Sequence, residues 1–158
     1  MFGHVVDDRA GGAVMGLPPQ GAERAALPER APLREGDAIE LRVTPDPYVT
    51  VRYAGASGDF NPIHIDEQFA LQVGLPGRIL HGLWSMAQVA RATTEAAGDP
   101  TALRSLSVQF RGMGRIGEEV VVSGEVASVA DGVATAKLEA TQGDTRLIRN
   151  AVAELRVD

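Results

Sequence analysis

The spacing of apolar residues changes once along this chain, near Leu103, and that change constrains the fold most. Before it, residues 82–97 repeat small and apolar side chains every three or four positions, as on one face of a helix. After it, apolar and polar residues alternate, as in strands that face a core on one side. One helix followed by several strands predicts an α+β fold in which an antiparallel sheet covers one face of the helix. The helical stripe is Leu83, Met86, Ala87, Ala90, Thr94 and Ala97, and the strand runs lie at 106–110, 120–126, 134–140 and 147–155.

Turn signals separate these runs. Gly98-Asp99-Pro100 ends the helix, because glycine readily takes left-handed backbone angles and proline cannot continue a helix. Asp131-Gly132 is a strong signal for a two-residue hairpin, and Gln142-Gly143-Asp144 supplies a second tight turn. With such short connections we expect the later strands to form an antiparallel meander.

The segment before the long helix predicts one strand and two shorter helices. Residues 39–43 alternate between apolar and polar side chains, as in a strand. We expect Thr44 to cap a helix over residues 47–56, and Asp66 to cap a short helix over residues 67–73.

Residues 1–32 and residues 33–158 differ in character. The first segment is rich in Gly, Pro and Ala without periodicity, which predicts a flexible leader. The second has the length of a single domain with one core. No window is apolar for long enough to span a bilayer, and Asp7, Asp8 and Arg9 stand where a signal peptide has its apolar core. The expected location is the cytoplasm.

The composition excludes several kinds of function. The chain has no cysteine, which removes disulfides, thiolate nucleophiles and cysteine metal ligands. Its formal net charge of −6 argues against nucleic acid as the main partner, because phosphate binding needs concentrated basic surface. No two histidines have the helical spacing of a zinc site, so we expect neither a metal ion nor another cofactor.

Residues 53–66 hold the best candidates for chemistry. They read Tyr-Ala-Gly-Ala-Ser-Gly-Asp-Phe-Asn-Pro-Ile-His-Ile-Asp. Pro62 has no backbone N–H and pushes Asn61 toward extended geometry, so the segment from Asp59 to His64 is not a regular helix. Alone, the acid could cap a turn and the histidine could be a packed core residue. Presented together from a kinked loop, they can converge on one water, as general acid–base catalysis requires.

The dipeptide His81-Gly82 stands at the start of the predicted long helix. The N–H of Gly82 could therefore hold a developing oxyanion. Ser85, one turn further on, lacks the Gly-x-Ser-x-Gly context that activates a serine, and we expect it to be structural.

Together the two segments resemble the MaoC-like hydratases and dehydratases, which include R-specific enoyl-CoA hydratases and (3R)-hydroxyacyl-ACP dehydratases. The signature of that family is approximately Tyr-Ala-x-x-Ser-Gly-Asp-x-Asn-Pro-x-His, followed about seventeen residues later by His-Gly. The resemblance extends over roughly residues 33 to 157, and it implies the hot-dog fold, in which the sheet wraps a central helix.

The resemblance also implies an activity in fatty acid metabolism and a role for each matching residue. The activity is the reversible hydration of trans-2-enoyl thioesters to (3R)-3-hydroxyacyl thioesters. Asp59 and His64 would hold the water, and the N–H of Gly82 would bind the thioester oxygen. Asn61 would orient the loop, and His81 would pack and form hydrogen bonds at the helix start.

Further expectations concern the substrate and the assembly. Trp84 could line the acyl tunnel or fill a dimer contact. Arg78, Arg111 and Arg115 are the nearest basic residues and are candidates for the phosphates of the carrier, either CoA or an acyl carrier protein. We expect a homodimer or a heterodimer with a related hot-dog chain, because one helix leaves a sheet edge and an apolar sheet surface uncovered.

Two alternatives stay open. A hot-dog acyl thioesterase would attack the thioester carbonyl instead of C3, but such enzymes lack the Asp-x-Asn-Pro-x-His motif. A substrate-binding chain of a heterodimeric dehydratase would hold the acyl thioester without turning it over, but the presence of both Asp59 and His64 favours the catalytic chain. The acyl length, the carrier and the physiological direction are left open.

Overall fold

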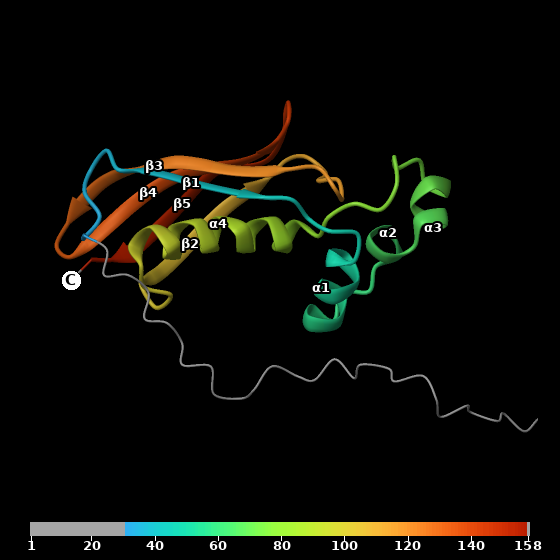
Figure 1. Ribbon diagram of the computed structural model, residues 1–158, viewed down its shortest axis with the longest axis horizontal. Coiled ribbons are helices and arrows are strands. Elements are labelled where there is room, and N and C mark those ends of the chain that lie inside the picture. The colour runs from blue at the N-terminus through green and yellow to red at the C-terminus, as the bar shows by residue number, and fades with distance from the viewer. Residues whose placement is uncertain (1–30, 158) are drawn as a thin grey trace, which may run out of the picture.

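A five-stranded antiparallel sheet lies over one long helix, and three shorter helices gather at one end of it (Figure 1). The computed structural model describes residues 31–157, so the predicted leader lies almost wholly outside the described residues. The arrangement confirms the predicted α+β class. The strands are β1 (Ala38–Val43), β2 (Leu103–Phe110), β3 (Val120–Ala130), β4 (Val133–Gln142) and β5 (Thr145–Arg156), and the helices are α1 (Val49–Ser57), α2 (Pro62–Ile65), α3 (Glu67–Gln72) and α4 (Gly82–Ala97).

The strands are ordered β1-β3-β4-β5-β2 across the sheet. Both predicted hairpins form, and Asp131 and Gly132 have the positive φ angles of 50° and 72° that the first of them needs. The predicted meander is wrong for β2, which pairs with β5 and not with β3. The alternation of apolar and polar residues shows which face of the sheet a side chain lies on. Which strands are neighbours depends instead on the path of the segments that connect them. Here residues 111–119 cross the sheet, because Arg111 N–H donates to the carbonyl of Leu147 and Gly117 N–H to that of Pro45.

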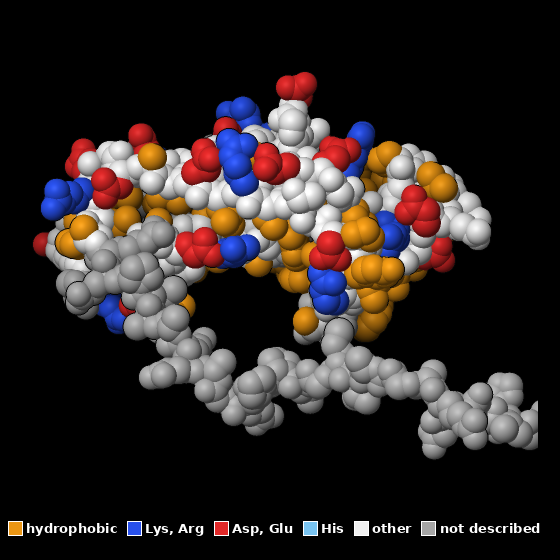
Figure 2. Space-filling view, viewed as in Figure 1, with side chains coloured by type: hydrophobic (Ala, Val, Ile, Leu, Met, Phe, Trp, Pro, Cys, Tyr) orange, Lys and Arg blue, Asp and Glu red, His pale blue; other side chains and the backbone are white. Residues whose placement is uncertain are grey.

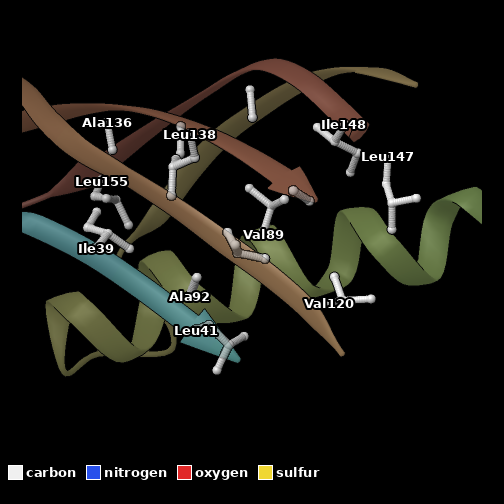
Figure 3. Close-up of a cluster of buried hydrophobic side chains, with 14 of the residues drawn as sticks. Ile39, Leu41, Val89, Ala92, Val120, Ala136, Leu138, Leu147, Ile148 and Leu155 are labelled. Atoms are coloured by element: carbon white, nitrogen blue, oxygen red, sulfur yellow. The ribbon is translucent and has the colours of Figure 1, made fainter. Parts of the chain in front are cut away.

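The core lies between α4 and the inner face of the sheet (Figure 3). Val89 and Ala92 of the helix pack against residues such as Ile39, Leu138 and Leu155, which come from three strands. Each fully buried Leu or Ile side chain contributes roughly 1.5–3 kcal/mol to folding. This packing holds α4 against the inner face of the sheet.

The helix α4 has its predicted bounds, but the predicted stripe faces the core only in part, through residues such as Met86 and Ala97. Leu83, which was placed on that stripe, is 57% exposed. Three of the buried residues are polar, so apolar periodicity did not identify them. Two of them are satisfied within the helix, because Gln88 Nε2 donates to the carbonyl of Trp84 at 3.3 Å and Thr93 Oγ1 to that of Ala90 at 2.8 Å. The buried residues of α4 are Ser85, Gln88, Val89, Ala92 and Thr93.

The first of the three short helices begins later than predicted. Val49 is the first residue of α1, and Thr44 does not cap it. Instead the carboxylate of Asp46 accepts the N–H of Tyr48 at 2.9 Å just before the helix.

The helix α2 was not predicted. Pro62 opens it, because the N–H that proline lacks would have no partner in the first turn. Asn61 before it is extended, with φ −55° and ψ 125°, as expected of a residue that precedes proline. Asp66 caps α3 as predicted, by accepting the N–H of Phe69 at 3.0 Å.

The outer face of the sheet is polar. Figure 2 shows charged side chains of both signs along the sheet, whereas hydrophobic side chains gather around α1, α2 and α3. Glu125 of β3 and Lys137 of β4, for example, are opposite each other and exposed. The expected uncovered apolar sheet surface is therefore wrong for this face, and what the chain leaves open is the two edges, β1 and β2. Within residues 31–157, no helix combines the length and apolar character needed to cross a membrane.

Candidate active site

Three rings from separate segments meet where α1, α2 and the start of α4 converge. The rings of His64 in α2 and His81, directly before α4, have centroids 3.9 Å apart and planes 25° apart. The ring of Tyr53 in α1 also packs against His81, with centroids 4.7 Å apart. His64 and His81 are buried, with 8% and 1% of their surface exposed. The structure thus brings together the two motifs that lie apart in the sequence.

One ring nitrogen of His64 forms no hydrogen bond within residues 31–157. Its Nδ1 lies 2.8 Å from the main-chain oxygen of Ile79. Because a carbonyl oxygen can only accept, Nδ1 carries the proton and Nε2 is left as a base. Asn61 Oδ1 accepts the N–H of Ile63 at 3.3 Å, which holds the turn that carries His64. This is the contact expected of a residue that orients the loop.

His81 holds the main chain of Asp59. Its Nε2 donates to the carbonyl oxygen of Asp59 at 3.1 Å, so Nδ1 is unprotonated and is buried without a hydrogen-bond partner among residues 31–157. Burial is the main cause that lowers the pKa of His81, and the neighbouring His64 lowers it further. This environment favours a neutral His81 ring, which orients its neighbours through its hydrogen bond and its ring contacts.

The Asp59 side chain is exposed and sits on a tight turn. Gly58 directly before it has φ 78°, a left-handed conformation that favours glycine. Asp59 Oδ1 accepts the N–H of Asn61 at 3.2 Å, and the Asp59 N–H donates to Ser57 Oγ at 3.2 Å. The loop thereby fixes the carboxylate without burying it.

A carboxylate oxygen of Asp59 and a ring nitrogen each of His64 and His81 lie within 4.8 Å of one another. Two groups that bind the same water are at most about 5.6 Å apart, twice a hydrogen-bond length. The separation of Asp59 and His64 is therefore compatible with one water held between them, which is the arrangement that proton exchange with a water requires.

The same three residues carry donor atoms of the kind that bind metal ions. An imidazole binds a metal ion in the plane of the ring, along its lone pair. The rings of His64 and His81 are stacked with planes only 25° apart, so the two planes do not meet at a point close to both rings. The ring geometry does not fit a metal centre.

Gly82 opens α4 beside an aromatic ring that the sequence analysis missed. A Cβ built on Gly82 would lie 3.3 Å from two atoms of the Phe110 ring. The N–H of Gly82 is in the first helical turn, where no helical carbonyl accepts it. Phe110 ends β2 and is 49% exposed. Alternation identified it only as a strand residue, and its contact with Gly82 depends on where β2 joins the sheet, for which the sequence holds no local signal.

Two other residues of the first turns of α4 lie against the core. Trp84 is half-buried and packs on the core cluster. Ser85 is 4% exposed, which agrees with the structural role expected of it.

The three predicted phosphate-binding arginines are not all together. Arg78 and Arg115 line one cavity of about 300 Å³, and Arg111 is not part of its lining. In that cavity Arg78 pairs with Glu67 and Arg115 with Glu118, each at 3.4 Å. The cavity is therefore close to neutral, and phosphate binding there stays a prediction.

Comparison with known proteins shows the family to which this chain belongs. A family profile described as MaoC like domain matches residues 28–146. The chain belongs to the MaoC-like family. It is 38% identical over 99 residues to fatty acid synthase subunit beta of Aspergillus oryzae, an alignment that covers 60% of this chain and 5% of the relative. It is 37% identical over 86 residues to peroxisomal enoyl-CoA hydratase 2 of Arabidopsis thaliana, covering 53% of this chain and 26% of the relative. The MaoC-like chain thus spans a minor part of either relative.

Solved structures share the MaoC-like architecture. The (R)-hydratase from A. caviae involved in PHA biosynthesis matches with a TM-score of 0.73 at 21% identity, covering 80% of this chain and 98% of that one. This likeness confirms the hot-dog fold. A chain of the ChsH1–ChsH2 complex from Mycobacterium tuberculosis matches with a TM-score of 0.72 at 27% identity, covering 78% and 98%.

Proposed function

We propose that this MaoC-like chain is a hydro-lyase that adds water reversibly to trans-2-enoyl thioesters to give (3R)-3-hydroxyacyl thioesters. The observation that carries the proposal is the placement of Asp59 and His64 within reach of one water, beside the start of α4. The 37% identity to peroxisomal enoyl-CoA hydratase 2 supports the same class of reaction. The (3R) configuration rests on the family resemblance.

Hydration requires a hydroxyl at C3 and a proton at C2. The oxygen of the bound water bonds to C3 while one of its protons passes to the Asp59–His64 pair, and the pair returns a proton to C2 on the same face. Dehydration uses the same groups in reverse, because one of them removes the C2 proton and the other protonates the departing 3-hydroxyl. Acid–base catalysis of this kind accelerates a reaction by roughly 10²- to 10⁴-fold.

Negative charge grows on the thioester oxygen as water adds to C3. The N–H of Gly82, reinforced by the dipole of α4, would stabilise it, and such a donor contributes on the order of 10²- to 10³-fold. Phe110 beside Gly82 offers an apolar contact for the acyl group. Phe60 and Leu83, the neighbours in sequence of Asp59 and Gly82, are 59% and 57% exposed and add apolar surface around the site.

A second chain would complete the acyl site. The edge strand β2 ends at Phe110, so a partner that joins this edge would come close to Gly82. The partner would be a second copy or a related hot-dog chain, and the match to one chain of the ChsH1–ChsH2 complex supports such an assembly. Phosphates of the carrier, CoA or an acyl carrier protein, would then approach Arg78, Arg111 and Arg115.

Purified protein incubated with crotonyl-CoA, and separately with a long-chain trans-2-enoyl-CoA, tests the proposal. Loss of the enoyl absorbance without release of free thiol, and a product of (3R) configuration, are the expected results. Release of free CoA would indicate a thioesterase instead. Saturable binding of the enoyl-CoA without turnover, by a chain that gains activity only with a partner, would indicate the substrate-binding subunit.

A further inference from the structure

Gln142, the last residue of β4, is buried and forms three hydrogen bonds to one loop. Its Oε1 accepts the N–H of Arg115 at 2.7 Å. Its Nε2 donates to the carbonyl oxygens of Arg115 and Glu118, both at 2.8 Å. The amide orientation is forced, because the N–H can only donate and the two carbonyls can only accept. The side chain therefore holds residues 115–118 against the end of β4.

The loop held by Gln142 pairs in turn with the segment that precedes α4. Ile79 and Arg115 form an antiparallel bridge, and the N–H of Leu80 donates to the carbonyl of Gly114 at 2.8 Å. The backbone of Gly114 also packs closely on the Leu80 side chain, since a Cβ on Gly114 would lie 2.8 Å from Leu80 Cδ1. Residues 79 and 80 thus have a fixed position relative to the loop.

The same two residues set the environment of His64. The carbonyl of Ile79 accepts the Nδ1 proton of His64 at 2.8 Å, and the N–H of Ile79 donates to the carbonyl of Ile63 at 3.2 Å. His81, whose ring stacks on His64, directly follows Leu80. A shift of residues 79 and 80 would change the hydrogen bond that decides which nitrogen of His64 is protonated.

We propose that Gln142 is a positioning residue for His64. Through residues 115–118 and Ile79 it holds the carbonyl that keeps the proton on Nδ1 of His64 and leaves Nε2 as the base. Its effect on rate rests on the proposed hydratase function, whereas its effect on the His64 ring does not. In the sequence, Gln142 is marked only by its place before a tight turn.

Two substitutions disrupt the hydrogen bonds from Gln142 to residues 115–118 in different ways. Gln142→Met keeps the side-chain length and removes all three hydrogen bonds. Gln142→Glu keeps the shape and the acceptor, but turns a carboxylate oxygen toward two carbonyls. Burial raises the pKa of such a carboxyl group, and protonation gives back one donor, so this variant should recover as the pH falls. The control is Gln88→Met, because Gln88 is also buried but its amide donates only within α4, to Trp84.

Nitrogen-15 spectra of the histidine rings give the decisive readout. The chain has three histidines, so the ring signals can be assigned by single substitutions. In the wild type we expect His64 in the Nδ1-protonated form. In Gln142→Met its signals should move toward the average of the two neutral forms, while Gln88→Met leaves them unchanged. For crotonyl-CoA hydration, we expect kcat of Gln142→Met to fall up to about 100-fold with little change in KM.

If Gln142→Met does not fold, Gln142→Glu replaces it, and its His64 signals should depart further from the wild type as the pH rises. Unchanged His64 signals in a folded variant at Gln142 would overturn the inference, whatever the activity. A wild-type protein that shows the Nδ1-protonated ring but hydrates no enoyl thioester would overturn the proposed function instead, and the ring spectra of the variants would still decide the role of Gln142.

Discussion

The rings of His64 and His81 are stacked 3.9 Å apart, and each donates to a different main-chain carbonyl. Donation from Nδ1 leaves His64 with a free Nε2, whereas donation from Nε2 makes His81 a support for the backbone of Asp59. Burial, together with the neighbouring His64, lowers the pKa of His81, so the His81 ring favours the neutral form. One histidine is thereby available for proton transfer while the other maintains the geometry.

Because of His81, we expect the protein to lose stability as the pH falls below about 6.5. Burial lowers the pKa of His81 from its ordinary value of 6.5, so the unfolded chain binds the proton more readily than the folded one. The free energy of unfolding therefore decreases as the pH drops from 6.5 toward the folded pKa. Urea unfolding over a pH series measures this change. A His81→Asn variant should be less stable overall but show a flatter dependence, and equal slopes would contradict the assignment.

Gly82→Ala tests the space at the start of α4. The N–H remains, but the new Cβ would lie 3.3 Å from the Phe110 ring, where the thioester is expected to bind. We predict a fall in kcat/KM of at least about tenfold. The double variant Gly82→Ala/Phe110→Ala separates two causes. If crowding by Phe110 alone were responsible, the double variant would be as active as the single variant Phe110→Ala, whereas a clash with the substrate keeps it less active.

Two glycines with opposite surroundings test the sheet and α1. A Cβ on Gly124 in β3 would lie 2.0 Å from the carbonyl oxygen of Lys137, so Gly124→Ala should destabilise the fold by about 1–3 kcal/mol or more. Gly55 in α1 has nothing within 4 Å of its Cβ position, so Gly55→Ala should stabilise by roughly 0.5–1 kcal/mol. Chemical denaturation gives both values. A stable Gly124→Ala protein would show that β3 and β4 are not this close.

The protein should be at least a dimer in solution. Charged residues such as Glu40 and Arg42 lie on the edge strand β1, while β2 offers an edge that ends at the exposed Phe110. We expect β2 to be the edge that a partner covers. Sedimentation equilibrium at micromolar concentration measures the mass, and a monomer with full activity would rule out the shared acyl site.

Patterns local in sequence were predictable, and relations between distant segments were not. The bounds of α4, the hairpin at Asp131-Gly132 and the cap at Asp66 each follow from a few neighbouring residues, and they were predicted. The place of β2 beside β5 depends on how residues 111–119 cross the sheet, which no local pattern encodes.

The same distinction between local patterns and long-range contacts holds for the candidate site. The motif singled out Asp59, His64 and Gly82 as candidate residues. The contact of Phe110 with Gly82 and the hydrogen bonds of Gln142 join residues far apart in the chain, so they became visible only in the fold. Part of the buried face of α4 was missed because polar residues such as Thr93 satisfy their polar groups within the helix and can be buried.

The rate of enoyl-CoA hydration by Asp59→Asn and His64→Ala tests the central claim most directly. Asp59 supplies the carboxylate and His64 the imidazole that would hold the water. Each variant should therefore lose at least about 10²-fold in kcat/KM for crotonyl-CoA. Its circular dichroism spectrum should remain that of the wild type. A folded variant at either position that keeps a kcat/KM close to that of the wild type would contradict the account.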